Sequence, residues 1–128
     1  MRIYLWIGLG SALGGMLRYW LSGVIARQYG ETFPWGTLVV NVTGSFIIGF
    51  FATLTQPDGR WLVQPAGRIF FMVGVCGGYT TFSSFSLQTL QLMREGQWLY
   101  AGLNTLLSVA LCLLAVWFGH FLAQLLNR

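Results

Sequence analysis

A dense group of polar side chains lies in the stretch GGYTTFSSFS, at residues 77–86. It holds five serine and threonine hydroxyls and no charge, and Phe82 and Phe85 stand three residues apart on one helical face. An aromatic ring has a positive edge, so two such edges beside hydroxyls such as those of Thr81 and Ser84 could stabilise a small anion that has left water. In the alternative interpretation, the rings pack in a core and the hydroxyls bond carbonyls one turn earlier in the same helix.

The start of this stretch predicts an interruption of regular helix. Gly77, Gly78, Thr80 and Thr81 all have low helix propensity. Inside a membrane, non-helical backbone persists only where protein buries it or where it lines a water-filled cavity. An interruption would turn carbonyl oxygens outward, and two interruptions that meet at a dimer axis could hold a small hard cation.

Four further polar residues stand inside apolar segments. Asn41 could donate its amide hydrogens to an anion, or it could join two helices. Asn104 and Ser108 share a helical face and form either a narrow polar track or a hydrogen-bonded seam between helices. Arg18 either extends to the membrane surface or supplies positive potential at the mouth of an anion path.

The composition indicates that these residues belong to a membrane protein. The chain has 128 residues, of which 55% are hydrophobic and 8% are charged, whereas about 25% of the residues in a soluble domain are charged. A membrane-spanning helix needs roughly 20 mainly apolar residues. Segments of this kind predict one all-α domain with four spans, at about 3–26, 35–54, 68–93 and 98–126.

The charged residues favour a dimer of oppositely oriented subunits and weigh against nucleic-acid binding. With four spans, one side of the membrane holds Arg2, Arg60, Arg68 and Arg128, and the other holds Arg27 and Arg94, with Arg18 leaning toward it. Because cytoplasmic loops normally carry a clear excess of positive charge, this weak bias suggests insertion in both orientations, although a single orientation stays possible. The scattered arginines form no basic stripe for nucleic acid.

The acidic residues weigh against a proton-coupled exporter. The three acids, Glu31, Asp58 and Glu95, all fall in predicted loops or at helix ends. Small multidrug transporters are also four-helix, dual-orientation dimers, but they depend on a glutamate inside the membrane. An exporter of this type therefore remains only the alternative to a path for an anion.

Three blocks of the sequence resemble the signature blocks of the Fluc (CrcB) family of bacterial fluoride channels. They are GSALGGMLRYWLS at 10–22, PWGTLVVNVTGSFIIG at 34–49 and GVCGGYTTFSSFSLQ at 74–88. The resemblance covers the whole chain. It implies an antiparallel homodimer in the cytoplasmic membrane, with two pores that export fluoride passively and no catalysis.

The resemblance also assigns roles to individual residues. The carbonyls of Gly77 and Thr80 from both subunits would hold a structural sodium ion at the dimer centre. Phe82 and Phe85 would line the fluoride path with their ring edges, and Asn41 would donate to the ion. Arg18 matches the arginine of the first block, and Ser108 falls where the family has a polar track.

Two positions depart from the expected pattern. Ser84 stands where we expect threonine, and it keeps the hydroxyl. Gln88 stands where we expect glutamate, so a role for a carboxylate at the end of the pore is in doubt. A membrane assembly factor that transports nothing is a further hypothesis, but the short loops offer a partner little surface.

Overall fold

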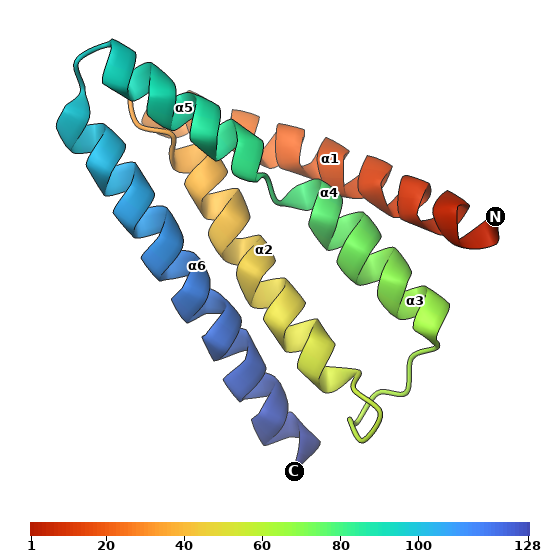
Figure 1. The fold of residues 1–128 in the computed structure, drawn as a ribbon. Helices are drawn as coiled ribbons and strands as arrows, with labels where there is room; N and C mark the ends of the chain where they lie inside the picture. The colour runs from red at the N-terminus through yellow and green to blue at the C-terminus, as the bar shows by residue number, and fades with distance from the viewer.

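The computed structural model describes residues 1–128 and contains only helices and their connections (Figure 1). In chain order they are α1 (Arg2–Tyr29), α2 (Trp35–Leu54), α3 (Pro65–Ile69), the π-helical segment η1 (Phe70–Cys76), α4 (Gly77–Tyr79), α5 (Phe82–Arg94) and α6 (Trp98–Asn127). The predicted segment 35–54 has the bounds of α2, and the helices at the other three segments extend slightly beyond the predicted limits.

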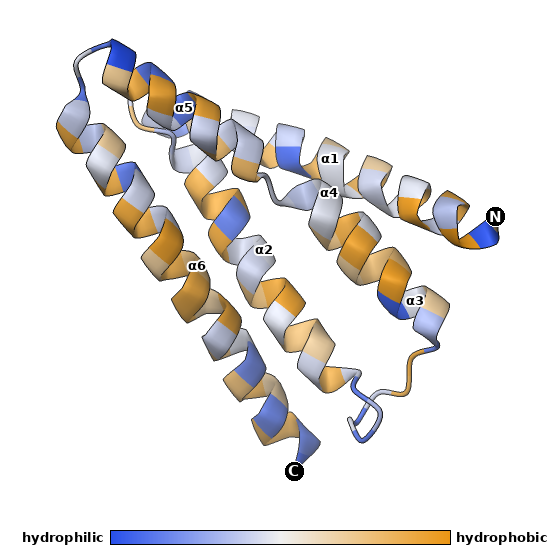
Figure 2. Cartoon of the chain, in the orientation of Figure 1, coloured by the Kyte–Doolittle hydropathy of each residue, from blue (hydrophilic) through white to orange (hydrophobic).

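Three helical stretches are long and apolar enough to cross a membrane: Trp35–Leu54, Pro65–Arg94 and Trp98–Asn127. The first helix, α1, has 28 residues and is long enough. It is not among the three stretches, because its three arginines and five glycines dilute its apolar residues. Figure 2 shows this difference, since α1 carries pale and blue turns where the middle of α6 is mostly orange.

The two longest apolar helices, α2 and α6, lie side by side and run in the same direction (Figure 1). Glycines bring their backbones close together. A Cβ atom on Gly119 would lie 2.9 Å from the backbone nitrogen of Phe50. Such small residues let helices approach where burial of apolar surface from water cannot drive their association.

A second close pairing joins α1 to the continuous rod of α3, η1 and α4. A Cβ atom on Gly10 would lie 2.6 Å from the carbonyl oxygen of Phe70 and 2.9 Å from the Cα atom of Gly74. Gly10 and Gly14 are the two buried residues of α1. The glycines four residues apart thus form the face through which α1 contacts the rod, and this contact places Arg18 beside the end of α4.

The chain buries few of its large apolar side chains. Only 23 of its 128 residues are buried, and exposed leucines, tryptophans and phenylalanines are spread over α1, α5 and α6. This distribution suits a protein whose exterior faces lipid or another subunit, because neither requires a polar surface.

Candidate functional site

The site is organised around a two-residue interruption between α4 and α5. The helix ends at Tyr79, Thr80 and Thr81 are extended (φ −79°, ψ 155° and φ −152°, ψ 112°), and α5 begins at Phe82. The Thr80 amide and hydroxyl both donate to the Cys76 carbonyl, each at 3.0 Å. The Thr81 hydroxyl accepts from the Ser84 amide at 3.2 Å, which caps the new helix.

Asn41 on α2 satisfies the backbone of the second extended residue. Its Nδ2 donates to the Thr81 carbonyl at 2.9 Å, and its Oδ1 accepts from the Thr81 amide at 2.7 Å. These two bonds fix the orientation of the side-chain amide, because the reversed amide would oppose donor to donor and acceptor to acceptor. Asn41 is thus the partner that satisfies both backbone polar groups of Thr81, which no helix or strand pairs.

Two neighbours of Asn41 contact the residues just before Thr81. The Thr43 hydroxyl lies 2.8 Å from the Tyr79 hydroxyl. A Cβ atom on Gly44 would lie 3.0 Å from the Tyr79 ring and would also clash with the Thr80 methyl group. One short stretch of α2 therefore contacts Tyr79 and both residues of the interruption, Thr80 and Thr81.

Arg18 on α1 reaches the same region from the other side. Its Nε donates to the Gly78 carbonyl at 3.1 Å, which is one of the carbonyls that the end of α4 leaves without a helical partner. The guanidinium therefore places positive charge at the interruption, where the helix C-terminus favours a cation. Since the side chain is part-buried and engaged there, it does not simply extend to the membrane surface.

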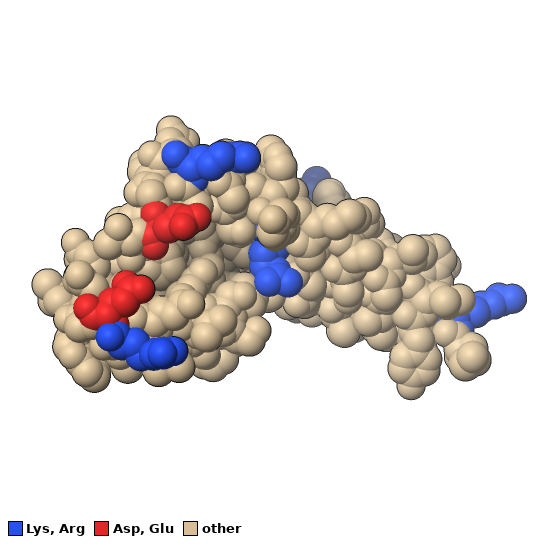
Figure 3. All heavy atoms as spheres, turned by 90° about the horizontal axis from the view of Figure 1, so that it is seen from above, with Lys and Arg blue, Asp and Glu red and all other residues tan.

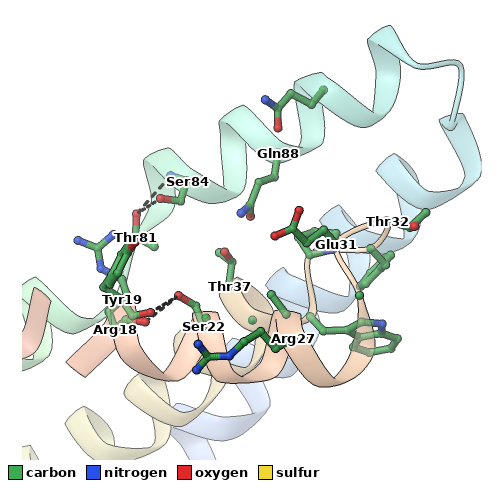
Figure 4. A pocket seen from close by; sticks show the side chains of 18 of the residues that line it. Arg18, Tyr19, Ser22, Arg27, Glu31, Thr32, Thr37, Thr81, Ser84 and Gln88 are labelled. Carbon is green, nitrogen blue, oxygen red and sulfur yellow. Dashed lines mark hydrogen bonds between the residues drawn. The ribbon is translucent and has the colours of Figure 1, made fainter. Parts of the chain in front are cut away.

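A cavity of about 920 Å³ leads from one end of the molecule to this region (Figure 4). Its walls are the second half of α1, the connection to α2, the first turn of α2, and α5. The polar side chains that line it are Arg18, Tyr19, Ser22, Arg27, Glu31, Thr32, Thr37, Thr81, Ser84, Gln88, Gln91 and Glu95. Figure 3 shows acidic and basic side chains gathered around a hollow at this end.

The inner part of the cavity offers hydrogen-bond donors. The Thr81 hydroxyl donates to the Ser84 hydroxyl oxygen at 3.1 Å, so the Ser84 hydrogen remains available to a ligand. Gln88 extends from α5 into the cavity (Figure 4), and its buried Oε1 accepts no hydrogen bond. The Ser84 hydroxyl and the Arg18 guanidinium can donate to an anion, whereas Gln88 Oε1 is an acceptor and would need a donor as its partner.

The two phenylalanines of the motif lie in different environments. Their ring centroids are 5.3 Å apart, with 48° between the ring planes. Phe85 is 9% exposed and belongs to the core, whereas Phe82 is 76% exposed. Core packing thus accounts for Phe85 within one chain but not for Phe82, whose ring projects from the surface.

Ser108 lies in a hydrogen-bonded seam between α5 and α6. Its hydroxyl donates to Asn104 Oδ1 at 3.4 Å, and Asn104 Nδ2 donates to the Thr89 hydroxyl at 3.0 Å. The Thr89 hydroxyl donates to the Phe85 carbonyl at 2.8 Å. The seam therefore connects α6 to the carbonyl of a motif phenylalanine, and it does not line the cavity.

The remaining predicted positions are Gly77, the first residue of α4, and Thr80, the first residue of the interruption. Gly77 is exposed and Thr80 is partly exposed. The Thr80 carbonyl oxygen accepts no hydrogen bond in the chain, which is uncommon for a backbone carbonyl inside a protein. This oxygen is available to a ligand or to a neighbouring subunit.

The structure brings Arg18, Thr81 and Ser84 together on the cavity wall, with Asn41 directly behind Thr81. Phe82 and Ser108 lie away from this wall. Sequence reasoning missed Thr43, Tyr79 and Thr89. A weak signal was present for two of them, because Thr43 is two residues after Asn41 and Tyr79 precedes the two threonines. Nothing in the sequence links Thr89 to Asn104, which is fifteen positions away.

Comparison with known proteins gives a consistent result. Residues 5–120 match the family described as CrcB-like protein, Camphor Resistance (CrcB). The chain is 65% identical over 99% of its length to a protein of Opitutus terrae named fluoride-specific ion channel FluC, and it covers 96% of that protein. Relatives with the same name in Paramagnetospirillum magneticum and Methylocella silvestris are 64% and 58% identical, over 100% and 98% of the chain and 100% and 95% of the relatives.

Proposed function

The chain belongs to the CrcB family, and on this premise we propose that it forms a fluoride-selective channel of the bacterial cytoplasmic membrane. It lets fluoride leave the cell passively and so reduces fluoride toxicity. The observation that carries the proposal is end-to-end identity of 64% with a protein named as a fluoride-specific ion channel. The donor-lined cavity that ends at Thr81 and Ser84 supports it, because an anion needs such donors. No catalysis is involved.

In this proposal the Ser84 hydroxyl and the Asn41 amide donate hydrogen bonds to fluoride and replace water molecules of its hydration shell. Asn41 uses Oδ1 and one Nδ2 hydrogen on Thr81, so its second Nδ2 hydrogen is left for the ion. Arg18 holds positive potential beside these donors. The ring edges of Phe82 and Phe85 continue the path, since the positive edge of a ring attracts an anion.

The proposed channel is an antiparallel homodimer in which α1 is a fourth membrane span. The exposed ring of Phe82 supports this assembly, because a partner subunit would bring the ring into a closed path. The glycine face of α1 packs on the rod of α3, η1 and α4, which is the first half of the apolar stretch Pro65–Arg94. The near balance of arginines between the two ends allows opposite orientations.

The residues at the interruption fit a structural sodium ion at the dimer centre. Oxygen dipoles suit a small hard cation, and the Thr80 carbonyl has no partner within the chain. Gly77 is exposed on the same short segment, where a second subunit could approach. The carbonyls of Gly77 and Thr80 from both subunits would hold the ion, which would add local positive potential without being transported.

The acids do not support the small-multidrug-transporter alternative. Asp58 lies in the exposed α2–α3 connection, Glu31 in the α1–α2 connection and Glu95 just after α5. None is inside a helix, where a coupling proton would have to bind.

Growth in fluoride tests the proposed function in cells. A bacterial host without a fluoride exporter is expected to grow at otherwise inhibitory fluoride when it expresses this chain. Chloride or bromide tolerance serves as the control. Equal fluoride sensitivity with and without the chain in its membrane would contradict the proposal.

A further inference from the structure

The hydroxyl of Tyr79 has one hydrogen-bond partner in the chain, the hydroxyl of Thr43. Tyr79 is the last residue of α4 and is 6% exposed. Its hydroxyl lies 2.8 Å from the Thr43 hydroxyl. The Thr43 hydroxyl has two carbonyl acceptors in its own helix, Val39 at 2.8 Å and Val40 at 3.2 Å. Because its single hydrogen can serve these carbonyls, we assign Tyr79 as the donor and Thr43 as the acceptor.

This bond is one of two anchors that flank Thr80. On one side Tyr79 is anchored to Thr43, and on the other side the backbone of Thr81 is anchored to Asn41. Gly44 leaves the space that the Thr80 methyl group occupies between them. The Thr80 carbonyl accepts no hydrogen bond itself, but it shares a planar peptide unit with the Thr81 amide. The direction of that oxygen therefore depends on the Asn41 bond to this amide and on how Tyr79 is held.

We infer that the Tyr79–Thr43 hydroxyl pair is a positioning device that directs the Thr80 carbonyl oxygen toward a cation. The inference rests on the proposed function, in which that oxygen contributes to a sodium site. A phenylalanine at position 79 would fill nearly the same volume. The hydroxyl therefore contributes orientation, and its bond to α2 prevents the end of α4 from rotating.

The Tyr79→Phe substitution removes the hydroxyl bond with little other change to the packing. In Tyr79→Phe the Thr43 hydroxyl still donates to the Val39 carbonyl, so no buried donor loses its partner. The overall fold should therefore change little, because leaving a buried donor unpaired is the costly part of removing a hydrogen bond. Thr43→Ala removes the acceptor from the other side, and Thr43→Ser keeps it.

The test is the sodium dependence of thermal unfolding of the purified full-length protein, with choline replacing sodium. The readout is the sodium concentration that gives half of the maximal rise in Tm. Tyr79→Phe and Thr43→Ala should raise this midpoint about three- to tenfold, as expected when a bond that orients a ligand is lost. Thr43→Ser should keep the wild-type midpoint. Tyr100→Phe is the control for loss of a tyrosine hydroxyl elsewhere, because Tyr100 is 37% exposed and lies in α6, away from the interruption.

Three results would overturn the inference: a wild-type midpoint in Tyr79→Phe, an equal rise in Tyr100→Phe, or a wild-type Tm that does not respond to sodium. Fluoride efflux through the wild-type protein decides the proposed function separately. If efflux is normal and the Tyr79→Phe midpoint is unchanged, the inference fails while the channel stands. If the wild type passes no fluoride, the proposed function itself fails.

Discussion

The side-chain amide of Asn41 pairs with both backbone polar groups of Thr81, at 2.9 Å to the carbonyl oxygen and 2.7 Å from the amide nitrogen. A neighbouring strand would satisfy an extended residue in the same way, but here one side chain on α2 does so. The interruption between α4 and α5 is consequently a well-bonded structure, and it keeps the adjacent Thr80 carbonyl free.

Replacement of Asn41 by alanine should damage both stability and conduction. It leaves the amide and carbonyl of Thr81 without partners, and each unsatisfied buried group costs about 1–3 kcal/mol. We expect a lower Tm and at least a tenfold lower fluoride efflux. Asn127→Ala is the matched control, because Asn127 also bonds two backbone groups, the Thr53 carbonyl and the Arg60 amide, but far from the site. If both variants conduct normally, Asn41 has no special role.

Replacement of Arg18 by glutamine should reduce fluoride efflux severalfold, with a modest loss of stability. The variant loses the bond to the Gly78 carbonyl and the positive charge beside the inner donors. Arg27→Gln provides the comparison, because Arg27 lines the outer cavity without a hydrogen bond to the chain. Fluoride efflux is compared between the Arg18→Gln and Arg27→Gln variants at several ionic strengths. An equal loss of efflux in both variants would mean that total charge in the cavity matters and the position of Arg18 does not.

The glycine contact of α1 predicts a sharp difference between two nearby substitutions. In Gly10→Ala the new Cβ would lie 2.6 Å from the Phe70 carbonyl oxygen, whereas around Gly8 nothing lies within 4 Å. Gly10→Ala should destabilise the protein by about 1–3 kcal/mol through overpacking. Gly8→Ala should be neutral or slightly stabilising, since alanine favours helix. Denaturant titration followed by circular dichroism measures both, and equal effects would refute this packing.

The unequal exposure of the two phenylalanines predicts different costs for the same substitution. Phe85 is 9% exposed and Phe82 is 76% exposed. Phe85→Ile should lower both Tm and fluoride efflux, because it repacks the core. Phe82→Ile should leave the Tm of the subunit nearly unchanged and still abolish efflux. Normal efflux through a well-folded Phe82→Ile protein would remove this ring from the proposed path.

The sequence predicted the helical segments well because their apolar runs are long and bounded by turn residues. The segment 35–54 has the limits of α2. The sequence predicts an interruption that begins at Gly77 and Gly78, but both are helical in α4 and the extended residues are Thr80 and Thr81. The first segment is the exception, since the helix exists but is less apolar than the other membrane-length stretches.

The contacts that build the site could not be predicted from the sequence in the same way. The bonds Asn41–Thr81 and Arg18–Gly78 join residues 40 and 60 positions apart. They depend on how the helices pack, and no local pattern encodes that packing. For Asn41 the residue type predicted a donor to an ion or a link between helices. The structure adds that most of its hydrogen-bonding capacity holds the backbone of Thr81.

The most direct test of the central claim is anion efflux from proteoliposomes that contain the purified wild-type protein, recorded with fluoride- and chloride-selective electrodes. The proposed function predicts rapid loss of fluoride while chloride is retained, and no loss of either from protein-free liposomes. Well-folded protein that releases no fluoride, or that releases chloride as fast as fluoride, would contradict a fluoride-selective channel.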